Sequence, residues 1–175
     1  MNKTSSQIRQ DMIKFYGPKW DEFPSVDLYM DQIVEYINTS LQKLGMKNET
    51  KFITKSMVNN YVKNSVLIPP IKKRYNKNHI GYLIVVCLLK QCFSLAEISE
   101  MIEIYRNLKD KKIQMHYNHF MVSFETCLHE VFEKEQISFQ LYKDPTKEQA
   151  LMESAIKTVV YKLYTQYLLR SSSEK

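Results

Sequence analysis

Apolar residues recur along this chain mostly at intervals of three and four, the spacing that places side chains on one face of an α-helix. The pattern predicts helices over residues 6–16, 28–45, 54–64, 77–91, 95–105, 114–134 and 145–170. Only three glycines and five prolines interrupt the chain, so few turns and long helices are expected. The sequence therefore predicts an all-α fold class, mainly helical with one small β element.

Residues that cap helices stand at several of these predicted boundaries. Thr54 and Asn76 each precede a predicted helix, and Ser94 with Glu97 has the spacing of a capping box. Asp144-Pro145 would place a cap and a first-turn proline at the start of the last helix. Residues 110–112 are expected to form a linker, and residues 171–175 are expected to fray.

The predicted β element lies between the third and fourth helices. Pro69-Pro70 forbids a helix and favours an extended segment. Residues 66–75 are too short and too interrupted for a buried strand. They suit a small protruding ribbon.

The positive charge of the chain is concentrated in one window. Residues 51–92 hold eight lysines and arginines and no acidic residue, whereas residues 1–50 and 93–175 each carry a net charge of −1. The whole formal charge of +6 therefore comes from this window. A positive charge concentrated in this way indicates what the protein binds rather than how stably it folds. Nucleic acid is the polyanion expected for a small basic protein.

The helix over residues 54–64 has the composition of a DNA-recognition helix. Its polar face would hold Lys55, Ser56, Asn59, Asn60 and Lys63. Asparagine can pair with adenine edges, and lysine with guanine or phosphate. A solvated helix face beside a charged loop is the alternative.

The basic run Lys72-Lys73-Arg74 falls on the predicted ribbon. It would lie as a wing over the phosphates that flank the recognition helix. Phosphate contacts of this kind fix the position of a protein on DNA but carry little sequence information.

Several short motifs, in a fixed order and spacing, carry a resemblance to a known family. They are LYMDQ at 28–32, MVNNYVK at 57–63, PPIKKRY at 69–75 and LLKQCFSLAEI at 88–98. These four motifs resemble a bacterial domain of unknown function that is described as MerR-like. More broadly, the order Tyr61, Ser65, Val66-Leu67, Pro69-Pro70 and Lys73-Arg74-Tyr75 resembles the DNA-binding head of MerR-type winged-helix regulators. In that head a helix ending in tyrosine precedes Gly-Leu-Leu, a proline, an Arg-x-Tyr wing and a helix pair.

The resemblance implies a domain organisation. Residues 1–24 would form an N-terminal helix and linker, residues 25–108 a winged helix-turn-helix head, and residues 109–175 a helical pair for dimerisation or ligand binding. Carried onto this sequence, the DNA-facing positions of the family include Asn59, Asn60, Tyr61, Lys73, Arg74 and Tyr75. With the helix face and the ribbon, the predicted DNA-binding set is Lys55, Ser56, Asn59, Asn60, Tyr61, Lys63, Lys72, Lys73, Arg74 and Tyr75.

These observations favour a non-enzymatic, DNA-binding transcriptional regulator that acts on double-stranded DNA as a homodimer. The sequence has no phosphate-binding glycine loop, nucleophile elbow or HExxH motif. Two alternatives stay open. One is a protein-interaction or adaptor module without specific DNA binding, since Asn59 replaces an arginine and Ser65 a glycine of the family pattern. The other is a sensor whose C-terminal helices enclose a small-molecule effector.

No cofactor, metal or membrane is expected. His116 and His119 have helical spacing, but Cys127 and His129 do not share one helix face with each other. The most apolar run, residues 80–89, is too short to cross a bilayer, and residues 1–10 lack the apolar stretch of a signal peptide. A cytoplasmic location is therefore expected. The sequence leaves open whether the C-terminal helices dimerise or complete one core.

Overall fold

A computed structural model describes residues 3–48, 50–107, 112–140 and 142–174. Its α-helices are α1 (Ser5–Ile13), α2 (Met30–Leu41), α3 (Lys55–Lys63), α4 (Lys77–Leu89), α5 (Leu95–Arg106), α6 (Ile113–Lys134) and α7 (Lys147–Ser173). Two short 3₁₀ turns are η1 (Trp20–Glu22) and η2 (Gln42–Leu44). The predicted, mostly helical fold is confirmed. Most of the predicted linker, residues 110 and 111, lies outside the described residues.

Helix starts follow the predicted caps except at α7. The Thr54 hydroxyl accepts the Met57 N–H at 3.3 Å, and Ser94 caps α5 with Glu97 completing the box. Asp144-Pro145 does not cap α7, so that prediction is wrong. Thr146 caps it instead: its hydroxyl accepts the Gln149 N–H at 3.3 Å, and the Gln149 side-chain oxygen accepts the Thr146 N–H at 2.9 Å.

The end of α7 also differs from the prediction. The helix continues through Ser173 rather than fraying from Ser171. Its final serine hydroxyls donate to carbonyls one turn back, and the Glu174 carboxylate accepts the Ser5 N–H at 3.1 Å. These bonds anchor the last turn against α1.

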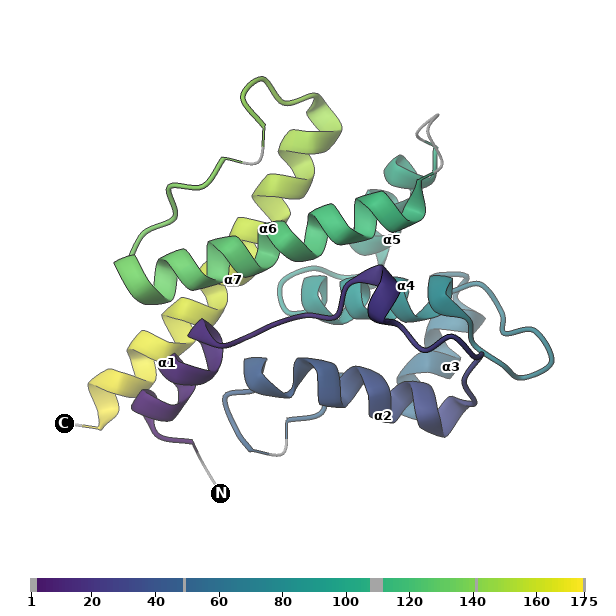
Figure 1. Cartoon of the computed structure of the whole chain (residues 1–175), viewed down its shortest axis with the longest axis horizontal. Coiled ribbons are helices and arrows are strands. Elements are labelled where there is room, and N and C mark those ends of the chain that lie inside the picture. The colour runs from purple at the N-terminus through teal and green to yellow at the C-terminus, as the bar shows by residue number, and fades with distance from the viewer. Residues whose placement is uncertain (1–2, 49, 108–111, 141, 175) are drawn as a thin grey trace.

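The helices stack in layers around α4. Figure 1 shows α6, α4 and α2 one above another, while α7 crosses α6 diagonally and ends beside α1. Residues 80–89 of α4 are apolar nearly all round, and a helix of that kind is stable only when it is covered on every side. Accordingly, Ile80, Leu83, Ile84 and Val86 are completely buried.

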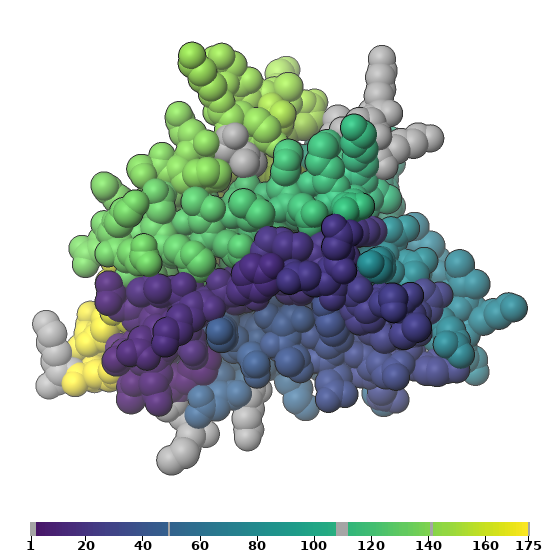
Figure 2. Space-filling model, viewed as in Figure 1, coloured from purple at the N-terminus to yellow at the C-terminus, as the bar shows by residue number. Residues whose placement is uncertain are grey.

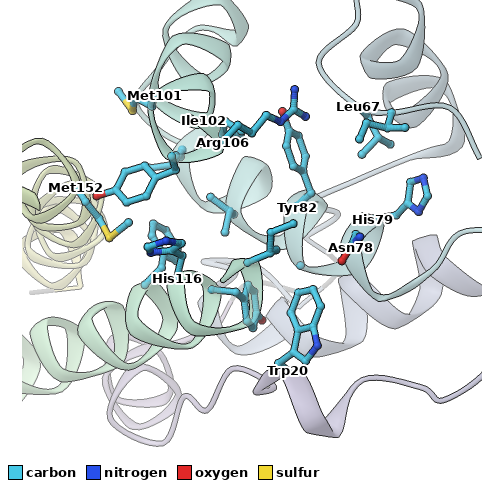
Figure 3. A pocket seen from close by; sticks show the side chains of 18 of the residues that line it. Trp20, Leu67, Asn78, His79, Tyr82, Met101, Ile102, Arg106, His116 and Met152 are labelled. Carbon is cyan, nitrogen blue, oxygen red and sulfur yellow. The ribbon is translucent and has the colours of Figure 1, made fainter. Parts of the chain in front are cut away.

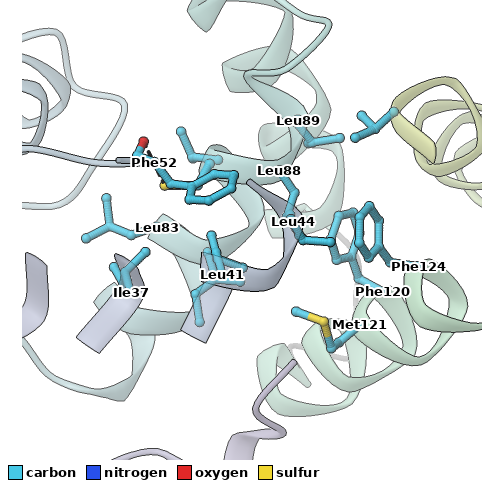
Figure 4. Close-up of a cluster of buried hydrophobic side chains, with 14 of the residues drawn as sticks. Ile37, Leu41, Leu44, Phe52, Leu83, Leu88, Leu89, Phe120, Met121 and Phe124 are labelled. Atoms are coloured by element: carbon cyan, nitrogen blue, oxygen red, sulfur yellow. Dashed lines mark hydrogen bonds between the residues drawn. The ribbon is translucent and has the colours of Figure 1, made fainter. Parts of the chain in front are cut away.

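The core between α2, α4 and α6 joins distant parts of the chain. Figure 4 shows Ile37 and Leu41 of α2 facing Leu83 and Leu88 of α4, with Phe120, Met121 and Phe124 of α6 alongside. Buried residues of α1 and α7 belong to the same cluster. The apolar stripes of α6 and α7 therefore help to complete one core. The division into three regions stays a prediction.

Residues 66–75 form a turn rather than a strand pair. Ile71 and Arg74 exchange backbone hydrogen bonds of 2.9 and 3.1 Å, and Leu28 and Tyr75 exchange two of 2.8 Å. These are isolated bridges, and the described residues contain no strand, so the small β wing is not confirmed. We call residues 71–74 the basic hairpin.

The two central residues of the basic hairpin adopt an uncommon backbone. Lys72 and Lys73 have φ angles of 49° and 63°, in the left-handed region that glycine and asparagine favour. Two left-handed residues between reciprocal hydrogen bonds match the tight hairpin turn of type I′. Here lysines occupy a turn for which Asn-Gly is the usual sequence.

Candidate nucleic-acid interface

The outer face of α3 is polar and accessible. Val58 and Tyr61 turn inward and are 0% and 2% exposed. The opposite side exposes five of the predicted DNA-binding residues, which are Lys55, Ser56, Asn59, Asn60 and Lys63. The helix thus separates core and surface as its apolar spacing predicts.

A single asparagine holds the start of α3 against α2. The Asn38 side-chain oxygen accepts the N–H groups of Phe52 and Ile53 at 2.8 and 3.2 Å, and its amide donates to the Val34 and Ile53 carbonyls at 2.9 Å. This contact ties the long link between α2 and α3 to α2 just before α3 begins. Sequence reasoning missed Asn38. Its place inside a helix, where asparagine is disfavoured, was the available signal.

The basic hairpin presents three cations. Lys72, Lys73 and Arg74 are all exposed. The Arg74 guanidinium donates to the Tyr29 hydroxyl at 2.8 Å and lies 4.5 Å from the centre of the Tyr29 ring. Tyr29 precedes α2 and was not predicted as a site residue. It limits the freedom of Arg74 and leaves other N–H groups of the guanidinium available.

The start of α2 brings α3 and the basic hairpin to one end of the molecule. Asp31 in the first turn of α2 pairs with Lys55 at the start of α3, while Tyr29 holds Arg74 of the hairpin. Figure 1 shows this end on the right, and in Figure 2 the hairpin projects from it as a teal tip. We call the exposed face of α3 and the basic hairpin together the basic end.

Three lysines of the basic end are available to an anion. Lys63, Lys72 and Lys73 are exposed and form no ion pair within the described part of the chain, whereas Lys55 is paired with Asp31. Unpaired surface lysines attract phosphate without first breaking an internal contact.

Two predicted DNA-binding residues lie in the core instead. Tyr61 is 2% exposed and Tyr75 is 3% exposed. The Tyr75 and His79 rings pack edge to face, with their centres 5.3 Å apart. Neither ring reaches the surface, so in this structure they position α3 and the hairpin rather than contact a partner. Burial raises the pKa of Tyr61 to about 12, and its hydroxyl has no hydrogen-bond partner among the residues that the structure describes.

The residues considered for a metal site do not converge. Cys127 is buried, and burial raises the pKa of its thiol to about 11, which keeps it protonated at neutral pH. The His129 Nε2 lies 2.9 Å from the Phe15 carbonyl. No group of three metal-ligating side chains comes together among the residues the structure describes. Nor does any helix there have the length and apolar character to cross a bilayer.

Part of the chain matches a known protein family. A family described as "Domain of unknown function (DUF1836)" matches residues 18–120, which is more than half of the chain. The match includes α2 to α5 and the whole basic end. No curated protein and no solved structure showed significant similarity. The comparison carries no sign of a MerR relationship, which stays a prediction.

Proposed function

The chain belongs to the DUF1836 family, whose function is unknown, and from its basic end we propose that it is a DNA-binding transcriptional regulator. In this proposal α3 enters the major groove of duplex DNA, and the basic hairpin follows the neighbouring phosphates. The observation that carries it is that exposed lysines without an ion pair among the described residues gather at one end of the molecule, and that they come from a sequence window without acidic residues.

The dimensions of α3 suit a groove. An α-helix with its side chains is about 10–12 Å across, which matches the roughly 12 Å width of the major groove. The adjacent amides of Asn59 and Asn60 are exposed on this face, and asparagine is the side chain that pairs with both hydrogen-bonding atoms of adenine. Lys55 and Lys63 at the two ends of the helix would meet phosphates.

The basic hairpin is held in place before any partner arrives. Its closing bonds, its bridge to Leu28 and the Arg74–Tyr29 contact fix its direction. An ordered contact element loses less conformational entropy on binding than a flexible loop does.

The test is selection from a randomised duplex pool, followed by affinity measurements at two or more salt concentrations. Lys72→Ala/Lys73→Ala is expected to weaken binding to all sequences and to reduce the salt slope by about two. Asn59→Ala/Asn60→Ala is expected to relax sequence preference by about 1–3 kcal/mol per lost base contact while leaving the salt slope almost unchanged. Lys143→Ala/Lys147→Ala removes two exposed lysines away from the basic end and serves as the charge-matched control.

Three results would contradict the proposal. They are the absence of binding at low salt, equal weakening by the control variant, and binding that enriches no sequence. Enrichment of inverted repeats, together with sedimentation at twice the chain mass, would support the homodimer that the sequence predicts.

One observation favours a protein-interaction module instead. Val26, Ile68 and Ile71 are 67%, 62% and 67% exposed, and Ile71 belongs to the basic hairpin itself. Exposed aliphatic side chains commonly mark contacts with proteins. If the selection finds no DNA binding at low salt, this second function becomes the favoured one.

A further inference from the structure

A cavity of about 330 Å³ lies where α4, α5, α6 and α7 meet the segment that leads into the basic hairpin. Figure 3 shows Met101 and Met152 at one end and Leu67 and His79 at the other. Its volume is at the lower end of the range of roughly 300–1,000 Å³ for small-molecule sites. The structure therefore has room for a small ligand outside the basic end.

The walls of the cavity are aromatic and apolar. The hydroxyls of two lining tyrosines are already used, since Tyr105 donates to the Glu148 carbonyl at 2.9 Å and Tyr117 to the Pro18 carbonyl at 2.7 Å. These tyrosines therefore offer a ligand mainly their rings. Methionines at one end supply polarizable side chains that adapt to different apolar shapes.

The charge of the cavity has one sign. No aspartate or glutamate occurs among its described lining residues, whereas Arg106 is among them. The Arg106 guanidinium lies 5.1 Å from the centre of the Tyr82 ring and 3.7 Å from the Glu103 carboxylate, and its side chain is 38% exposed. The unpaired Nε2 of His79 is closed off from solvent, so it cannot meet a ligand directly. Arg106 is the one arginine or lysine among the described lining residues, so recognition of an anionic head rests mainly on it.

We propose that this cavity binds a small apolar carboxylate, an acyl chain or ring system with one anionic head. The apolar body would fill the aromatic space, where burial of its surface supplies the affinity. The carboxylate would meet the Arg106 guanidinium, whose planar fork matches carboxylate oxygens. A cationic head would find no carboxylate among the described lining residues.

The sequence provides its own reporter for this site. Trp20 is the single tryptophan of the chain and lines the cavity. Titration of the full chain with decanoate, followed by tryptophan fluorescence, is expected to give a saturable change below the micelle concentration. Decanol and decyltrimethylammonium keep the apolar chain and change the head group. Both are expected to bind at least about tenfold more weakly than decanoate.

Two variants test the two parts of the ligand. Arg106→Gln is expected to lower the affinity for decanoate about tenfold, which is the effect of losing one charge-assisted hydrogen bond. It is expected to leave decanol unchanged. Val85→Phe adds a ring to a lining position on α4 and is expected to abolish the response to both compounds. Lys143→Gln, which removes one exposed positive charge outside both the cavity and the basic end, is the control.

Circular dichroism and thermal melting establish that each variant folds. If Val85→Phe does not fold, Arg106→Gln and the three head groups still decide the matter. Equal affinity for all three head groups, or no effect of Arg106→Gln, would overturn the anionic assignment. The absence of a saturable response would overturn the site. None of these measurements involves DNA, so their outcome is independent of the proposed function.

Discussion

At the scale of single residues, Tyr61 shows how two kinds of sequence evidence can disagree. Its spacing with Val58 places it on the apolar stripe of α3, whereas the family resemblance implies a DNA-facing position. The structure agrees with the spacing, because the ring is 2% exposed. A motif records which residue occurs at a position, but periodicity records which side of the helix it occupies.

Replacing Tyr61 by phenylalanine is expected to stabilise the fold. The buried hydroxyl has no partner, so its removal should raise the free energy of unfolding by about 1 kcal/mol at neutral pH. Tyr117→Phe is the control, since its hydroxyl donates to Pro18 and its loss should lower stability by a similar amount. Urea denaturation of both variants measures the effect, and a destabilised Tyr61→Phe would contradict it.

Burial of Tyr61 also predicts that the fold loses stability at alkaline pH. The pKa of Tyr61 rises from 10.0 to about 12 on folding, so the unfolded chain ionises first. Because the neutral form is favoured in the folded state, ionisation of Tyr61 does not affect the free energy of unfolding below pH 10. That free energy then falls as the pH rises from 10 through 12. Tyr61→Phe should therefore lose less stability over this interval than the wild type, as unfolding midpoints at several pH values would show.

At the scale of elements, the helices could be predicted because their signals are local. Apolar spacing and cap residues within four positions were enough to place α3, α4 and α5. The start of α7 was misplaced because two cap signals compete within three residues, and Thr146 has the partner that Asp144 lacks. The form of the basic hairpin was not predictable, since its left-handed residues are lysines rather than glycines.

Substitutions of the left-handed Lys73 are expected to affect the stability of the fold and DNA binding separately. Lys73→Gly should raise the free energy of unfolding by about 0.5–1 kcal/mol, because glycine adopts this backbone without strain. Lys73→Ala keeps the strain and should show no such gain. Both variants lose one charge, and both should reduce the salt slope of DNA binding by about one. Equal stability of the two variants would show that the turn is not strained.

At the scale of the whole molecule, the important contacts join distant residues. Arg74 with Tyr29 and Asn38 with Ile53 set the direction of the hairpin and of α3. One sequence without aligned relatives carries no record of such pairs. The cavity was unpredictable for the same reason, since η1, the segment before α4 and the helices α4 to α7 all contribute to it. The expectation of aromatic C-terminal helices around a ligand anticipated only part of its wall.

The cavity and the basic end share a segment of chain. Leu67, Ile68 and Ile71 line the cavity, and Ile71 begins the basic hairpin. If both proposals hold, saturating decanoate is expected to change DNA affinity about fivefold or more, the usual scale of coupling between sites. DNA must then change decanoate affinity by the same factor, which titrations in both orders can check. Unchanged affinities would show two independent sites.

The anchoring of α1 has a consequence for the order of folding. Its contacts lie far along the chain, since Arg9 donates to the Phe132 carbonyl and Ser5 to Glu174. During synthesis α1 is made long before α6 and α7, which pack against it. Its apolar side chains Ile8 and Met12 therefore stay incompletely buried until those helices are made. Helix α1 thus reaches its native place only after the much later helices α6 and α7 are made, and until then its exposed apolar side chains would be a target for a chaperone.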